Sequence, residues 1–269
     1  MSLRINSNIE AYNAHRQLVA TNDKLQKSMQ RLSSGQRINS ASDDAAGLAI
    51  SEKLKAQING VAQAQRNAQD AMSMTQTAES SLTEVHAMLQ RVRELAVEFH
   101  NGTLATSDRT AIQSEINQLA SEIERIGNAA EFNGIKLLSN AATITFQVGA
   151  QDGQVIAINT ISLGTAVPQS YFQLSATGTQ DLANLDQAID AVSAQRAGFG
   201  AVQNRFEHLL DGLGVYHENL VASESRIRDV DMASEMVNFT KLQILQQAGT
   251  SMLAQANQAA QSVLSLLRG

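Results

Sequence analysis

Three segments of the chain space their apolar residues alternately three and four apart, which is typical of helices that pack along one narrow seam. The longest segment lies between residues 182 and 220, and the others lie between 82 and 99 and between 112 and 126. The stripes consist of Leu82, Val85, Leu89, Val92, Ala96 and Phe99; of Ile112, Ile116, Leu119, Ile123 and Ile126; and of Leu182, Leu185, Ile189, Val192, Phe199, Phe206, Leu210, Leu213 and Leu220. Three helices with matching seams predict a helical bundle.

Polar turn residues separate the first and second of these helices in chain order. Asn101-Gly102 suits the end of one helix, Thr106-Ser107-Asp108 offers oxygen atoms that can cap the start of the next, and Phe132-Asn133-Gly134 has turn chemistry after it. The segment from 106 to 132 is therefore predicted to be one helix.

The apolar period then changes from helical to alternating. Ile144, Phe146 and Val148 alternate with other residues, and residues 155–161 are rich in β-branched side chains. This pattern predicts a β-hairpin. From there to Thr179 serine, threonine, glycine and other small residues dominate, so we expect a short surface loop.

Both ends of the chain carry a sparse apolar stripe. The N-terminal stripe is Leu18, Leu25, Met29 and Leu32, and the C-terminal stripe is Leu245, Ala248, Met252, Ala259, Val263 and Leu266. Between residues 232 and 269 only Glu235, Lys241 and Arg268 are charged. Because the outer face of such a helix also avoids charge, we expect it to have neighbours.

A free-energy comparison bears on whether these ends are ordered alone. Ordering about 40 residues costs on the order of 40 to 80 kcal/mol in backbone entropy, whereas burying a few medium apolar side chains returns about 10 to 25 kcal/mol. We therefore hypothesise that both ends are largely disordered in the monomer and fold when they meet other subunits.

The composition excludes several classes of partner and chemistry. The chain has 269 residues, one proline, no cysteine, no tryptophan and a net charge of -6. The acidic balance gives no reason to expect nucleic acid as a partner, and the absence of cysteine excludes disulfides and thiolate chemistry. No stretch approaches the roughly 18 apolar residues of a membrane span, and the first residues lack the apolar core of a signal peptide. We expect no membrane insertion and no cleaved signal.

We find no catalytic constellation, metal site or cofactor motif, and predict that the chain is not an enzyme. The five histidines are scattered without metal-ligand spacing. Gly198-Phe199-Gly200 and Gly212-Leu213-Gly214 lack the rest of a phosphate-binding loop, so close helix packing is the better account of these glycines. Asp43-Asp44 is predicted to lie at a helix start, where negative charge meets the helix dipole.

Several longer sequence motifs, in order along the chain, resemble those of bacterial flagellins. The motifs are Arg31-Leu32-Ser33-Ser34-Gly35, Arg37-Ile38-Asn39-Ser40-Ala41, Asp43-Asp44-Ala45-Ala46-Gly47, Gln90-Arg91-Val92-Arg93-Glu94-Leu95-Ala96, Phe132-Asn133-Gly134, Gln147-Val148-Gly149-Ala150, Ile244-Leu245-Gln246-Gln247-Ala248-Gly249 and Leu264-Ser265-Leu266-Leu267-Arg268. The resemblance covers nearly the whole chain. It departs from the family pattern in the extra Gly269.

The resemblance implies a mainly α fold, a long antiparallel helical bundle or coiled coil with a small β-hairpin and with the N- and C-terminal helices paired. It implies an inner-core domain of residues 1–43 plus 229–269 and a bundle domain of residues 44–228. Ile161 to Asp181 leaves no room for the variable outer domain of larger relatives, so the chain resembles a short, core-only flagellin.

The implied function is that of a structural subunit that polymerises into the flagellar filament for motility. The chain would be exported unfolded through the flagellar type III apparatus and be extracellular. Implied partners are further copies of the chain, an export chaperone that binds the carboxy-terminal segment, and the filament cap and hook-junction proteins. The expected filament-core contacts are Leu18, Leu25, Met29, Leu32, Leu245, Met252, Val263 and Leu266.

A further partner implied by the resemblance is Toll-like receptor 5, at a face that matches Leu89, Arg91, Leu95 and Glu115. Two alternatives stay open. A hook-filament junction protein shares terminal coiled coils, and a soluble coiled-coil adaptor would explain the heptads but not the charge-poor C-terminal segment.

Overall fold

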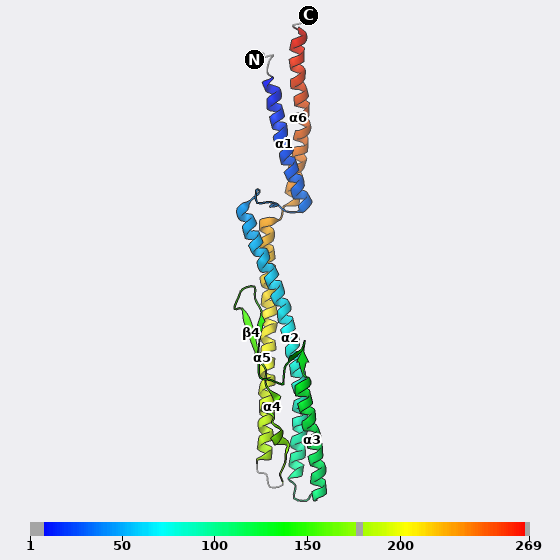
Figure 1. Cartoon of the computed structure of the whole chain (residues 1–269). Coiled ribbons are helices and arrows are strands. Elements are labelled where there is room, and N and C mark those ends of the chain that lie inside the picture. The colour runs from blue at the N-terminus through cyan, green and yellow to red at the C-terminus, as the bar shows by residue number, and fades with distance from the viewer. Residues whose placement is uncertain (1–7, 176–179, 267–269) are drawn as a thin grey trace. The chain divides into compact units, whose positions relative to one another are not determined.

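The computed structural model describes residues 8–175 and 180–266, with side chains as far as residue 258, and the chain is mainly helical (Figure 1). The helices are α1 (Ile9–Ser34), α2 (Ala45–Phe99), α3 (Thr106–Ala129), α4 (Leu163–Ala166), α5 (Asp181–Arg228) and α6 (Met232–Leu266), with a 3-10 turn η1 (Gln169–Phe172). The strands are β1 (Glu131–Phe132), β2 (Ile135–Lys136), β3 (Thr143–Gln147) and β4 (Val155–Asn159). The predicted helices and hairpin are confirmed.

The described chain divides into two compact units. The bundle unit is Gln57–Glu218, and the terminal unit comprises the residues up to Ala56 together with those from Asn219 onward. The expected domains, 1–43 plus 229–269 and 44–228, have their boundaries just outside α2 and α5, whereas these units divide both helices. The domain assignment stays a prediction.

The bundle unit has one core cluster formed by α2, α3, α5 and the hairpin. All six predicted residues of the α2 stripe, from Leu82 to Phe99, are buried, and so are the α5 residues spaced seven apart from Leu185 to Phe206. The α2 stripe also continues toward its start with the same spacing through smaller side chains, namely Val61, Ala64, Ala68, Ala71, Thr75 and Ala78. The bulky Phe199 and Phe206 of α5 are buried in the core of the same unit.

Two hairpins follow α3. The first joins β1 to β2 through Asn133 and Gly134, whose φ angles of 50° and 78° suit a type I′ turn. The second pairs β3 with β4 in antiparallel register, with Ile144 opposite Ile158. Its ends are tied to the helices, because the amides of Asn67 and Gln195 donate to backbone oxygens of the hairpin at 2.9 and 2.7 Å.

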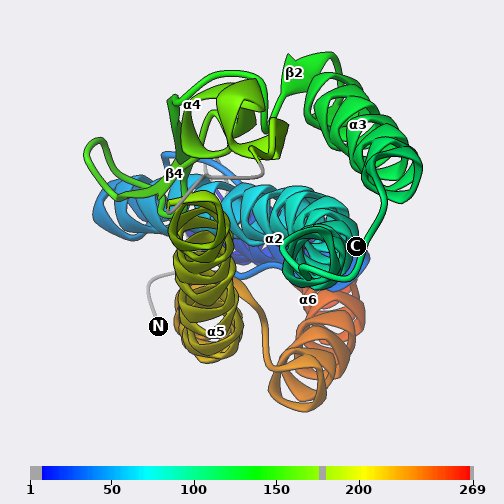
Figure 2. The same ribbon diagram turned by 90° about the horizontal axis from the view of Figure 1, so that it is seen from below.

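The expectation of a surface loop between residues 161 and 179 is wrong for its described part. The segment forms α4 and η1, lies alongside α3 (Figure 2), and buries the side chains of Leu163, Val167 and Phe172. These apolar residues lie four and five apart among small polar ones, and the small polar residues dominated the sequence-based interpretation. Residues 176–179 lie outside the described residues.

Close packing within the chain does not explain the four glycines of α5, so that prediction is wrong. A Cβ atom added to Gly198, Gly200, Gly212 or Gly214 would meet no atom within 4 Å. Gly198 and Gly212 lie on an exposed part of the helix surface. Nothing in the described part of the chain accounts for these glycines, each of which disfavours a helix by about 1 kcal/mol.

The helices begin where the sequence predicted, but the residues that cap them differ in part from those expected. Asp44 caps α2, because its Oδ1 accepts from the backbone N–H of Gly47 at 2.9 Å. Asp43 instead closes the preceding turn, and the hydroxyl of Ser40 lowers the pKa of its carboxyl group. In front of α3 the residue at the cap is Ala105, and its N–H donates to Asp108 at 3.1 Å.

In the terminal unit α1 and α6 lie side by side and run antiparallel (Figure 1). Gly35 ends α1 in a left-handed conformation with a φ angle of 70°, and its N–H donates to the carbonyl of Arg31. Where each helix of the pair meets its connecting segment, the two segments are hydrogen-bonded. Arg37 N donates to Arg228 O at 2.7 Å, and Val230 N donates to Gly35 O at 3.0 Å.

Candidate assembly surface

The two terminal helices pack through a regular seam. On α1 the residues facing α6 are Ala11, Ala14, Leu18, Thr21, Leu25, Ser28 and Leu32, and on α6 the matching residues are Glu235, Phe239, Leu242, Gln246, Gly249, Leu253 and Ala256. Each set alternates three and four apart and is less exposed than its neighbours. Small or polar residues fill more than half of these positions, so the seam buries little apolar surface for its length.

The pair also exposes large apolar side chains. The set consists of Ile9, Tyr12, Val19 and Met29 on α1 and of Met232, Met236, Val237, Ile244, Leu245 and Met252 on α6. These side chains are between 46% and 74% exposed, and we call them the exposed apolar set. A helix that is apolar on its packed face and on its outer face needs a partner beyond the one it already has.

One side of the pair is hollowed into a groove of about 770 Å³. Leu18 and Thr21 of α1 form part of one wall, and Leu245, Ala248 and Met252 of α6 form part of the other. The groove is therefore built from both ends of the chain, and three of these five residues are apolar members of α6.

The predicted filament-core contacts divide between the seam and the exposed surface. Leu18, Leu25 and Leu32 are half-buried against α6. Met29, Leu245 and Met252 belong to the exposed apolar set. The side chains of Val263 and Leu266 lie outside the described residues. Sequence reasoning placed both kinds of residue in one stripe per helix, because it did not separate the two apolar faces of α6.

The four residues of the proposed receptor face also divide by burial. Leu89 and Leu95 are buried in the bundle core and present no surface to an external partner. Arg91 and Glu115 are about half-exposed, and Arg91 Nη2 lies 3.0 Å from Glu115 Oε1. The hydrogen bonds that Arg91 donates to Glu115 and Glu94 raise the pKa of its guanidinium group. Any external contact at this face would therefore involve the ion pair and not the leucines.

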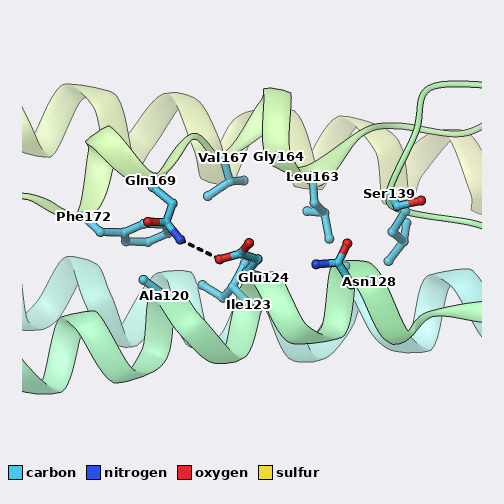
Figure 3. Close-up of a pocket in the computed structure, with 12 residues that line it drawn as sticks. Ala120, Ile123, Glu124, Asn128, Ser139, Leu163, Gly164, Val167, Gln169 and Phe172 are labelled. Carbon is cyan, nitrogen blue, oxygen red and sulfur yellow. Dashed lines mark hydrogen bonds between the residues drawn. The ribbon is translucent and has the colours of Figure 1, made fainter.

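A cavity of about 310 Å³ lies between α3 and the segment with α4 and η1 (Figure 3). Its lining combines apolar side chains such as Leu163 and Phe172 with polar ones, and the carboxyl group of Glu124 already accepts a hydrogen bond from Gln169 Nε2 at 2.6 Å. This occupied carboxyl group has no second titratable partner in the cavity. Among the described residues there is also no group of three His, Cys, Asp or Glu that could hold a metal ion.

Comparison with known proteins agrees with this arrangement. Residues 5–143 match the bacterial flagellin N-terminal helical region, and residues 182–267 match the bacterial flagellin C-terminal helical region. The chain belongs to the bacterial flagellin family. The first matched region contains α1, α2 and α3, and the second contains α5 and α6. The β3–β4 hairpin and α4 lie largely between the two regions.

Full-length relatives support the membership. The chain is 49% identical to a flagellin of Halalkalibacterium halodurans over 98% of its length and 99% of that protein. It is 47% identical to a flagellin of Bacillus subtilis over 99% of this chain and all of that one. The crystal structure of Bacillus cereus flagellin aligns with a TM-score of 0.51 and 31% identity over 55% of this chain and 88% of that one.

Flagellin membership fixes the class of function. The chain is a structural subunit of the flagellar filament that serves motility, and it is not an enzyme. Its short length fits a core-only flagellin. In the part of the chain that is described, no helix is long and apolar enough to cross a membrane.

Proposed function

We propose that this flagellin polymerises through α1 and α6, with the exposed apolar set of one copy packing against neighbouring copies. The observation that carries the proposal is that α6 has apolar residues on two faces. Leu242 and Leu253 face α1, whereas Ile244 and Met252 point elsewhere and are 61% and 64% exposed. In a monomer the second apolar face stays exposed to water, but a helical polymer would bury it.

The groove supplies a receiving surface for such a contact. Its walls contain Leu18, Leu245 and Met252, and the nearby Val237 and Ile244 are exposed apolar side chains of a size to fill a hollow of this kind. When a projection on one copy fits a hollow elsewhere on the next, the contact repeats from copy to copy and produces a fibre if the rotation does not close into a ring. The expected filament-core contacts therefore stay a proposal, with Met29, Leu245 and Met252 as contacts between copies.

Export in an unfolded state through the flagellar type III apparatus is part of the same proposal. A chain without cysteine has no disulfide to block threading. The thin α1 and α6 seam, with its small and polar residues, suits ends that are disordered in the monomer and become ordered among other subunits. On this account the chain is extracellular.

Before export, the apolar faces of α6 would need cover. We propose an export chaperone that binds this segment as a helix in a groove and occupies the surface later used in the polymer. The filament cap and hook-junction proteins would meet the same terminal surface at the two ends of the filament. For Toll-like receptor 5 the proposal rests on Arg91 and Glu115, the two exposed residues of the implied face.

Seeded growth tests the polymerisation proposal. Soluble chain is added to sheared filament fragments, and elongation is followed by light scattering and electron microscopy. Met252→Gln should raise the critical concentration by about tenfold, because burying the exposed part of a methionine at an interface contributes about 1.4 kcal/mol. Met252→Leu keeps an apolar side chain of similar volume and should elongate as the parent chain does.

Parent chain that never elongates a seed would exclude polymerisation. Elongation that is the same for Met252→Gln and for the parent would exclude this face of α6 as a contact between copies.

A further inference from the structure

The leucines of the α1 and α6 seam do not by themselves define how the helices align. Leu18, Leu25 and Leu32 are spaced by seven, so sliding α1 along α6 by one heptad brings one leucine to the place of another. Seams of this kind need a feature that only one alignment satisfies. Besides the backbone hydrogen bonds between the connecting segments, two such features lie within the seam, one near its Glu235 end and one nearer its middle.

The first feature is a polar pair inside the seam. The hydroxyl of Ser28 donates to Oε1 of Glu235, and these residues are 2% and 9% exposed. Arg31 Nη1 lies 3.9 Å from the other carboxyl oxygen, and the amide of Asn238 lies 3.5 Å from Oε1. Glu235 is the one buried acidic residue among those described. A buried carboxyl group without its donor is strongly unfavourable, so its position on α6 is tied to that of Ser28.

The second feature is a notch at Gly249. A Cβ atom added there would lie 3.2 Å from Cδ1 of Leu18 and 3.9 Å from its Cβ, so the side chain of Leu18 occupies the space above the glycine. The contact fixes which α1 leucine lies over Gly249. The three antiparallel contacts Ser28 with Glu235, Leu18 with Gly249, and Asn8 with the carbonyl of Ala256 follow one alignment.

Each feature excludes one direction of slip. If α1 moved so that Leu25 took the notch, Glu235 would lie opposite Gly35, beyond the end of α1, and would lose its hydroxyl donor. If α1 moved the other way, Thr21 could replace Ser28, but Ala11 would replace Leu18 and leave the notch unfilled. We infer that Glu235, through Ser28, is the residue that determines the register of the terminal helix pair against the first slip, while Gly249 guards against the second.

This register also shapes the assembly surface. The groove takes Leu18 and Thr21 from α1 and Leu245 and Met252 from α6, so a slip of one heptad would bring different side chains to face each other across it. The inference therefore deepens the proposed polymerisation and, for its effect on filament growth, rests on it. Glu235 would determine specificity in the pair, at some expense of helix-pair stability.

Because the chain has no cysteine, paired cysteines can report the register directly. Leu18→Cys with Gly249→Cys reports the alignment of the structure, since the Cβ separation of 3.9 Å is that of an ordinary disulfide. Leu25→Cys with Gly249→Cys reports the slipped alignment. Both pairs are made in the full chain with Glu235, with Glu235→Leu and with Glu235→Gln. They are then oxidised in solution and after seeded growth, and disulfide yield is measured by mass spectrometry.

With Glu235 in place, the Leu18→Cys pair should trap paired ends as a disulfide, in higher yield after seeded growth than in solution, and the Leu25→Cys pair should not. Glu235→Leu should raise the yield of the slipped disulfide by about tenfold, the factor expected when one buried hydrogen bond no longer separates the alignments. Glu235→Gln keeps an oxygen that can accept from Ser28 and should stay close to the parent. A simple loss of helix stability would lower both yields, so the rise of the slipped disulfide separates register from stability.

Two further results keep this test apart from that of polymerisation. A slipped yield that is the same with Glu235 and with Glu235→Leu overturns the inference, whether or not the chain elongates seeds. If parent chain fails to elongate while the disulfides behave as expected, the proposed polymerisation fails and the register assignment stands. If both stand, Glu235→Leu should elongate seeds more slowly than Glu235→Gln.

Discussion

The ring of Phe146 on β3 meets the ring of Phe206 on α5 edge to face, with centroids 6.3 Å apart and planes at 88°. Phe206 is fully buried, and Phe146 packs against the core from the hairpin. Through this contact the hairpin closes the part of the bundle where α2 contributes mainly small residues.

We therefore expect Phe206→Ala to lower the free energy of unfolding by about 3 to 5 kcal/mol, because it removes a buried ring and leaves a cavity. Thermal or urea unfolding followed by circular dichroism measures the change. Phe206→Leu should lose less, since it fills part of the space. If Phe206→Ala were no less stable than Phe206→Leu, the hairpin would not be held by this ring.

The turn between β1 and β2 predicts a second change. Gly134 has a φ angle of 78°, a conformation that a residue with a Cβ atom adopts at a cost. Gly134→Ala should destabilise the chain by about 1 kcal/mol in chemical unfolding. Gly102→Ala serves as the control, because a Cβ there meets nothing within 4 Å and its φ is not positive. Equal stability of the two variants would contradict the assigned turn.

Glycines inside the long helices should respond in opposite ways. A Cβ at Gly60 of α2 would lie 2.8 Å from the Cβ of Ala150, so Gly60→Ala should destabilise the soluble chain by forcing the hairpin loop to move. Gly198→Ala meets open space and should stabilise it by about 0.8 to 1 kcal/mol, the difference in helix propensity. Unfolding midpoints of the two variants check both signs, and loss of stability in Gly198→Ala would contradict the open space at this position.

Acid should weaken the ion pair that joins α2 to α5. The hydrogen bond from Arg93 Nε to Asp186 Oδ1, 2.6 Å long, lowers the pKa of Asp186 below its ordinary value. A depressed pKa in the folded state means that the contribution to stability is present above the unfolded pKa. This contribution is lost as the pH falls through the folded pKa.

Arg93→Met removes both the hydrogen bond and the charge, so the pKa of Asp186 should return toward its ordinary value. Carboxyl titration by NMR measures it. The pKa of Glu122, which Arg125 lowers elsewhere on α3, should not change and serves as the internal control. An unaltered pKa of Asp186 in Arg93→Met would mean that the pair does not form in solution.

The heptads of the bundle could be predicted from the sequence because large apolar side chains mark them. The α5 stripe from Leu185 to Leu220 and the α2 stripe from Leu82 to Phe99 follow directly from spacing. The extension of the α2 stripe through Ala64, Ala68 and Ala71 could not, since alanine is as common on helix surfaces as in cores. Its role depends on the side chains that face it.

The terminal surface shows a different limit. Sequence spacing identified Leu245 and Met252, but it gave them the same role as Leu18 and Leu25, which pack in the seam. The residues that face α1 include Glu235, Gln246 and Gly249, which no hydrophobic pattern would select. A seam that uses polar and small residues becomes visible only when the partner helix is in place. Leu163, Val167 and Phe172 were missed for a similar reason, because isolated apolar residues in a Ser/Thr-rich segment have no period.

The central claim is that the exposed face of the terminal pair becomes covered when copies assemble. Mild peroxide oxidation, followed by mass spectrometry, measures this at Met29, Met236 and Met252, which are 51%, 50% and 64% exposed in the single chain. Half-buried Met72 and Met88 of the bundle unit serve as references. We expect Met236 and Met252 to oxidise readily in soluble chain and to be protected in sedimented filament, relative to those references. Oxidation of Met236 and Met252 at the same rate in filament as in soluble chain would contradict the account.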